Sequence, residues 1–115
     1  MDLEQFEKNI GYTFKSKELL KTALTHTSYA HENKVESNEK LEFLGDAILE
    51  FIVSDYLYHN YKNLKEGEMT KVRATVVCED SLYKIATKHN FSDFLYIGRS
   101  EIKCRRKRKT SNTCR

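Results

Sequence analysis

The chain contains no proline and no tryptophan, and only four of its 115 residues are glycine. Proline and glycine interrupt regular elements and supply tight turns, so their scarcity argues against a turn-rich β-sandwich. The length allows a single domain, and hydrophobic residues make up 39% of the chain, enough to bury a core. We therefore expect an all-α fold.

Cysteine is also scarce, and long apolar runs are missing. Cys78, Cys104 and Cys114 form neither an even set nor a close CxxC pair, which argues against a disulfide framework and against a zinc site. No apolar run approaches the roughly 20 residues that span a bilayer, and Met1 opens no signal peptide. We expect a cytoplasmic protein with free thiols and no membrane partner.

Acidic residues are nearly absent from the end of the chain. Residues 99–115 hold eight basic residues and one acidic residue, Glu101, a net charge of +7. Residues 1–98 hold twelve basic and sixteen acidic residues, a net charge of −4. The sequence thus predicts a folded body and a separate basic tail.

Helical periodicity covers most of the first 98 residues. A short amphipathic helix is expected to end at Gly11, and Ser16 is a candidate N-cap for a second helix. Residues 31–38 are expected to form a loop, with Asn38 as the N-cap of a long helix that reaches about residue 58. After a second loop at residues 62–67, apolar spacing predicts two further helices, around residues 69–77 and 82–86.

Four carboxylates recur along the long helix at spacings of three, four and four, namely Glu39, Glu42, Asp46 and Glu50. This spacing places them on one helix face, opposite the apolar stripe. The spacing leaves two interpretations open, a solvated acidic face or a site for a hard cation such as Mg²⁺. Gly45 is costly inside a helix and indicates close approach by another helix or a ligand. Phe43 lies off the apolar stripe and would be covered by a partner subunit.

Three segments of the sequence carry a recognisable pattern. Residues 38–49 read Asn-Glu-Lys-Leu-Glu-Phe-Leu-Gly-Asp-Ala-Ile-Leu, residues 23–29 read Ala-Leu-Thr-His-Thr-Ser-Tyr, and residues 65–74 read Lys-Glu-Gly-Glu-Met-Thr-Lys-Val-Arg-Ala. The first closely resembles the signature helix of the ribonuclease III family, and the others are similar to the family's flanking segments. The resemblance covers about residues 3–98 and implies the helical fold of the ribonuclease III endonuclease domain.

The resemblance implies a Mg²⁺-dependent endonuclease that cuts double-stranded RNA in RNA processing, ribosomal RNA included, with Mn²⁺ as an alternative ion. Glu42 and Asp46 match the family's metal-binding and catalytic acids, while Glu39 and Glu66 match further acidic positions near the cleft. Phe43 matches the aromatic residue that the family buries across its homodimer interface, on the signature helix. The ion would activate a water for in-line attack on the phosphate, and the substrate would be read by its A-form shape.

The sequence departs from the family near residue 100. Family members continue through a Gly-Gly turn into a helix with a second Asp and Glu, and then add a double-stranded-RNA-binding domain. We therefore expect residues 1–98 to be the N-terminal part of a catalytic domain whose C-terminal part is missing, and residues 99–115 to be a disordered or out-of-frame basic tail. One permitted set of codons for residues 104–115, read one base later, restores Gly-Gly and Ile-Leu-Ala, which favours a frameshift near residue 103. A natural phosphate-binding tail is the alternative.

Three interpretations follow for the whole chain. It is a truncated ribonuclease III with weak or no activity, a noncatalytic RNA-binding protein, or a dimerisation partner of a complete enzyme. His26 is interpreted as a hydrogen-bonded histidine at a helix end, and His31, His59 and His89 show no metal-ligand spacing.

Overall fold

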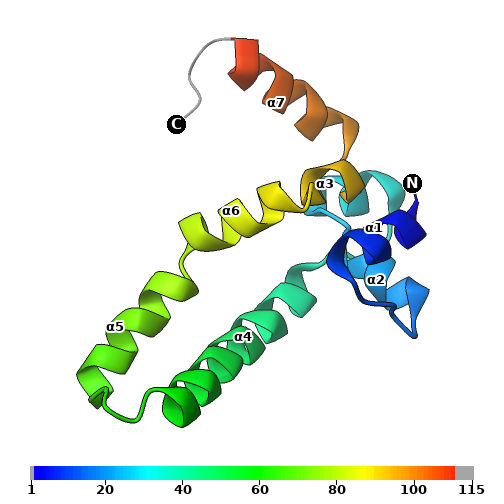
Figure 1. The fold of residues 1–115 in the computed structure, drawn as a ribbon. Helices are drawn as coiled ribbons and strands as arrows, with labels where there is room; N and C mark the ends of the chain where they lie inside the picture. Colours follow the sequence, from blue (N-terminus) through cyan, green and yellow to red (C-terminus); the bar gives the residue numbers. More distant parts are fainter. Residues whose placement is uncertain (1, 111–115) are drawn as a thin grey trace. The chain divides into compact units, whose positions relative to one another are not determined.

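The computed structural model of the protein describes residues 2–110, with side chains as far as Lys107. Its elements are α1 (Leu3–Ile10), α2 (Lys17–Ala23), α3 (Thr27–Asn33), α4 (Glu39–Asn60), α5 (Glu66–Val76), α6 (Glu79–Lys88), the 3-10 turn η1 (Phe91–Phe94) and α7 (Arg99–Thr110) (Figure 1). The described residues form no strand beyond one isolated bridge between Thr25 and Tyr96. The all-α prediction is confirmed.

Two further expectations concern features that the sequence lacks. Cys78 and Cys104 are free thiols, as predicted, whereas Cys114 lies outside the described residues. Within residues 2–110, no helix combines the length and the apolar composition that a membrane span requires.

The chain divides into two compact units. The first comprises residues 1–40 together with 93–115 and includes α1, α2, α3 and α7; the second comprises residues 41–92 and includes α5, α6 and nearly all of α4.

The helix ends of the first unit follow local signals that are visible in the sequence. Gly11 ends α1 in the left-handed conformation (φ 71°), and the side chain of Ser16 accepts a hydrogen bond from the backbone N–H of Leu19 at the start of α2. Both capping predictions are confirmed, because glycine tolerates positive φ and serine supplies an acceptor for an orphan N–H.

A small apolar core holds the first unit together. Phe6, Leu20, Leu24 and Ala30 are buried, and the ring of Phe6 meets that of Phe94 edge-on at 5.4 Å between centroids. The backbone N–H of Tyr96 donates to the carbonyl of Leu24, and that of His26 donates to the carbonyl of Tyr96. These contacts attach the segment before α7 to the loop between α2 and α3.

Helix α3 was not expected, because the sequence predicted a loop from residue 31. His26 is the N-cap of α3, and its Nδ1 accepts the backbone N–H of Ser28 at 3.1 Å, which confirms the helix-end interpretation of His26. Histidine is not among the usual N-cap residues, so the cap gave no clear sequence signal. The α4 helix begins directly after Asn38, as predicted. The Asn38 side chain, however, donates to the carbonyl of Ala23, and it is the hydroxyl of Ser37 that accepts the N–H of Glu39 at the start of the helix.

Helix α7 also differs from the expectation of a disordered basic tail. Residues Arg99–Thr110 are helical. The carboxylate of Glu32 in α3 accepts the backbone N–H groups of Arg99 (2.8 Å) and Ser100 (3.3 Å), which satisfies two orphan donors of the first turn. An out-of-frame origin for residues 99–115 stays a prediction, which the codons of the gene would decide.

The second unit has little core. Leu57 is the only buried residue among the described residues 41–92. The apolar stripe of α4 is exposed, with 55% of Leu44, 70% of Phe51 and 56% of Ile52 accessible. On α6, Leu82 and Ile85 are exposed as well, so the second unit carries a large apolar surface.

Candidate functional site

The carboxylates predicted to bind metal lie near the start of α4. The helix is continuous over Glu39–Asn60, so Glu42 and Asp46 lie one turn apart on the same face. Both side chains are exposed, and within residues 2–110 neither makes a hydrogen bond or ion pair. Two carboxylates four residues apart repel each other by a few tenths of a kcal/mol, and no described side chain forms an ion pair that offsets this. The pair is therefore available to bind a cation from solution.

The other acids of α4 frame this pair. Glu39 is the first residue of the helix, and its backbone N–H donates to the hydroxyl of Ser37 at 3.3 Å. Glu50 follows Asp46 by one turn on the same face, and its carbonyl accepts the hydroxyl of Ser54 at 2.7 Å. Both carboxylates are exposed, so the solvated acidic face, one of the two interpretations that the spacing left open, is present along with the candidate metal pair.

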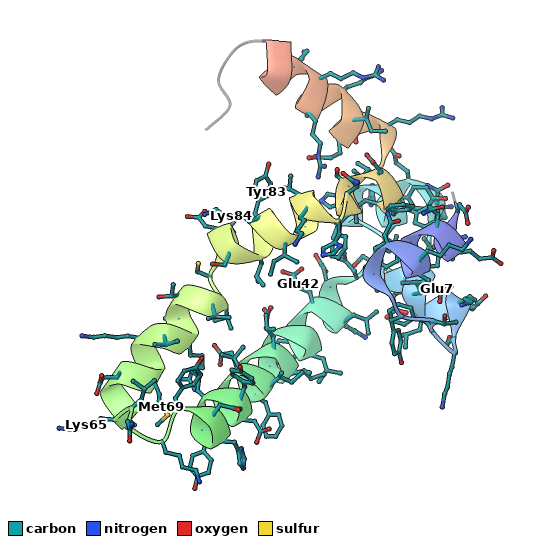
Figure 2. The ribbon with its side chains drawn as sticks, viewed as in Figure 1. Glu7, Glu42, Lys65, Met69, Tyr83 and Lys84 are labelled. Carbon is teal, nitrogen blue, oxygen red and sulfur yellow. The ribbon has the colours of Figure 1, made fainter. Side chains whose placement is uncertain are left out.

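Glu66, which the family resemblance matches to a further acidic position near the cleft, lies away from Glu42 and Asp46. It is the first residue of α5, directly after Lys65, and Figure 2 shows Lys65 and Glu42 at opposite ends of the α4–α5 pair. Glu66 lines a groove of about 360 Å³ together with Ser54, Asp55 and Arg73. The structure therefore places Glu66 with the C-terminal half of α4, away from Glu42.

The donor set fits a weakly held hard cation. Within the described residues, no group of three or more His, Cys, Asp or Glu side chains is arranged to hold a metal ion. Mg²⁺ keeps several waters and is commonly bound through one or two carboxylates, so Glu42 and Asp46 suffice for a hydrated ion. They provide too little charge for a tight all-protein site.

Phe43 and Gly45 lie between the two acids. The ring of Phe43 is 81% accessible, the highest value among the exposed large hydrophobic residues. A Cβ built at Gly45 would meet nothing within 4 Å, so packing inside this chain does not require glycine there. The close approach by another helix or a ligand that the sequence suggested at Gly45 therefore has no counterpart among the described residues.

Arg73 lies in the groove that Glu66 lines, although the sequence pattern did not mark it as a candidate site residue. Its guanidinium donates to the hydroxyl of Ser54 at 2.9 Å and joins α5 to α4 across this groove. The available signal was that Arg73 is the only arginine in residues 1–98, where every other basic side chain is lysine. A second, apolar groove of about 560 Å³ is also built by α4 and α5 and includes Ile52, Tyr56 and Val72.

Comparisons with known proteins bear on this arrangement. A family profile described as Ribonuclease-III-like matches residues 16–114. The chain is 50% identical over 104 residues to Ribonuclease 3 of Oceanobacillus iheyensis, covering 88% of this chain and 46% of that protein. It is 52% identical over 101 residues to Ribonuclease 3 of Caldanaerobacter subterraneus, covering 86% and 44%. The chain thus spans a little under half the length of these curated relatives.

A solved structure is similar as well. The nuclease domain of ribonuclease III from Campylobacter jejuni, described as flexible in a region involved in dimer formation, superposes with a TM-score of 0.82. It is 42% identical, and the match covers 89% of this chain and 69% of that domain. With its motifs, its helical fold and these similarities in agreement, the chain belongs to the ribonuclease-III-like family.

Proposed function

We propose that the chain is a ribonuclease III-type endonuclease that hydrolyses phosphodiester bonds in double-stranded RNA during RNA processing in the cytoplasm, ribosomal RNA included. The observation that carries the proposal is the pair Glu42 and Asp46, exposed and without partners among the described residues, on the helix that bears the family's signature. We assign both acids as metal-binding and catalytic residues. Mg²⁺ or Mn²⁺ held there would supply an activated water and positive charge at the scissile phosphate.

The role of the two side chains is to bind and orient the ion. Their separation of one helical turn on a continuous helix puts the two carboxylates within reach of one ion, and occupation by a cation removes their mutual repulsion. Because the described residues add no third carboxylate to the pair, we expect weak metal affinity. A misplacement of about 1 Å can cost on the order of 100-fold in rate, so we also expect weak activity from the chain alone.

We propose further that the chain forms a homodimer through α4. Three observations support it: the exposed ring of Phe43, the open space at Gly45 and the exposed apolar stripe of the same helix. The Campylobacter jejuni nuclease domain also has a region involved in dimer formation. A second copy would bury apolar surface that is otherwise in water, which is the main driving force for association of this kind.

The test is a time course on a long RNA duplex with Mg²⁺. We expect slow, Mg²⁺-dependent cutting that is lost in Asp46→Asn and in Glu42→Gln, because each change removes a charge that holds the ion. Glu50→Gln is the matched control, since Glu50 lies on the same face one turn further along and should leave the rate unchanged. Cutting that survives Asp46→Asn would contradict the site assignment.

The same experiment separates the other two interpretations. Salt-sensitive duplex binding without any cutting, even after long incubation with Mg²⁺ or Mn²⁺, would select a noncatalytic RNA-binding protein. Neither binding nor cutting, combined with pairing to a complete ribonuclease III subunit, would select a dimerisation partner.

A further inference from the structure

Helix α7 presents a face made of basic side chains. Arg99, Lys103 and Arg106 follow one another at spacings of four and three, so they lie in one row, and Lys107 lies beside them. All four side chains are exposed. The only acid of the helix, Glu101, pairs with Arg105 at 3.2 Å, and both lie on the opposite side of the helix. We call Arg99, Lys103, Arg106 and Lys107 the basic face.

The start of this helix is fixed to α3. The backbone N–H of Gly98 donates to the hydroxyl of Ser28 at 2.8 Å, next to the two N–H groups that Glu32 accepts. The hydrogen bond from Arg99 is the main cause of a lowered pKa at Glu32, so this carboxylate keeps its charge further into the acid range. The basic face is therefore presented from a defined position on the first unit.

The charges of the basic face oppose one another. Neighbours of like sign at spacings of three and four destabilise an isolated helix by a few tenths of a kcal/mol per pair. An anionic ligand would remove the repulsion. The remainder of the chain, residues 1–98, has a net charge of −4, so attraction to a polyanion is concentrated at α7.

The dimensions suit a nucleic acid strand. From Arg99 to Arg106 the helix axis advances about 10 Å, at about 1.5 Å per residue. Each nucleotide of a duplex strand carries a negatively charged phosphate, so a row of this length can face more than one phosphate of the same strand. Duplex RNA is recognised mainly through its shape, its phosphates and its 2′-hydroxyls, for which side chains that bind phosphate regardless of sequence are suited.

We infer that the basic face of α7 binds the phosphates of duplex RNA and so holds the substrate against the first unit. This rests on the proposed function, which makes duplex RNA the substrate, and adds to it a binding surface distinct from Glu42 and Asp46. Each cation that contacts a phosphate releases counterions, so the affinity falls with salt in proportion to the number of contacts.

The experiment measures binding of the full chain to a 30-base-pair RNA duplex in EDTA, where metal-dependent cutting is blocked, over a series of salt concentrations. The variant is the triple change Lys103→Gln, Arg106→Gln and Lys107→Gln. We expect the slope of log affinity against log salt to fall by about three, one for each lost contact, and the affinity at low salt to drop at least about tenfold. Glutamine forms helices about as well as lysine and arginine, and unchanged helicity by circular dichroism will verify the fold.

The matched control removes the same charge elsewhere, with Lys8, Lys15 and Lys88 changed to Gln, all exposed and outside α7. This control should keep the slope of log affinity against log salt that the parent shows. The conservative variant Arg106→Lys should keep it as well. A triple variant that binds like the parent, or a control that weakens binding equally, would overturn the inference. So would binding of the parent to vesicles of anionic phosphatidylserine with no binding to the duplex.

Failure here is distinguishable from failure of the proposed function. Loss of RNA binding in the α7 variant is measured in EDTA and does not depend on Asp46. Loss of cutting in Asp46→Asn is measured with Mg²⁺ on a chain whose α7 is intact. The binding prediction can therefore fail while the cutting prediction holds, and the reverse is also possible.

Discussion

Gly98 lies against α3 so closely that a Cβ at this position would come within 2.6 Å of the backbone carbonyl oxygen of Ser28 and 2.7 Å of the carboxylate of Glu32. Gly98 is buried, and its N–H donates to the hydroxyl of Ser28. The contact is with backbone, which cannot move aside as a flexible side chain can. Only glycine allows the chain to enter α7 along this path.

Gly98→Ala should therefore destabilise the protein. Overpacking of a closely fitted site costs about 1–3 kcal/mol, and the change should also weaken the capping of α7 by Glu32. The free energy of unfolding in urea measures the first effect. Gly67→Ala is the control, because a Cβ there meets nothing within 4 Å, and it should leave stability unchanged or slightly raise it. Equal stability of Gly98→Ala and the parent would contradict the close approach.

Stability should fall in acid because of Glu7. This buried carboxylate accepts hydrogen bonds from the ammonium of Lys17 and the backbone N–H of Phe14, which hold its pKa below the ordinary value of 4.5. A carboxyl group with a lower pKa in the folded state stabilises the protein above its unfolded pKa, and the contribution is lost as pH falls through the folded value.

The measurement for Glu7 is the melting temperature as a function of pH from neutral to strongly acidic. Below about pH 4.5 the parent should lose stability more steeply than Glu7→Gln, which has no charge to lose there. Glu18→Gln, a change at an exposed glutamate of the next helix, is the control and should follow the parent. Parallel curves of melting temperature against pH for the parent and Glu7→Gln would show that this carboxylate does not cause the loss of stability in acid.

Phe43→Ala should weaken self-association. If α4 is the dimer interface, removing an exposed aromatic ring from this helix should raise the dissociation constant about tenfold or more, the effect of losing about 1.4 kcal/mol or more at a hot spot. Sedimentation over a range of concentrations gives the constant. Tyr83→Ala, at a ring that is 70% accessible on α6, should have little effect. A monomeric parent would contradict the proposed homodimer outright.

Gly45→Ala should separate helix stability from assembly. Alanine is favoured over glycine inside a helix by about 1 kcal/mol, and the space around Gly45 is open, so the isolated chain should become more stable. If a second subunit or the ligand approaches the backbone there, the added methyl group should at the same time weaken dimerisation or catalysis. A melt and a sedimentation run on one preparation decide this. If Gly45→Ala is both more stable and more strongly associated than the parent, then no partner or ligand approaches the backbone closely at Gly45.

Metal binding should be weak and should depend on both acids. In a Mn²⁺ or Mg²⁺ titration we expect the affinity of the parent to be low and to fall further in Asp46→Asn and in Glu42→Gln, because a hydrated ion on two carboxylates has few charges to hold it. Glu66→Gln should leave the affinity of the same chain unchanged, since Glu66 lies at the other end of the α4–α5 pair. Tight binding insensitive to Asp46→Asn would contradict the site.

The helices were predictable from the sequence because their signals are local. Apolar spacing of three and four, the acceptor at Ser16 and the glycine at position 11 all act within about one turn of the residues they organise. The candidate metal pair was predictable for the same reason, since Glu42 and Asp46 need only a continuous helix to lie together. The sequence signature around Glu42 and Asp46 was also sufficient to indicate the family without the fold.

The tertiary structure decided the relationships between residues that are distant in sequence. The capping of α7 by Glu32 joins positions 67 residues apart, and the Ser54–Arg73 contact crosses from one helix to the next. Sequence spacing gave no indication that Glu66 lies against the C-terminal half of α4, away from Glu42, or that residues 99–110 continue as a helix. Local periodicity and capping determine where each helix begins and ends. Which helix ends meet depends on tertiary packing between residues that are far apart in the sequence, and no short segment contains that information.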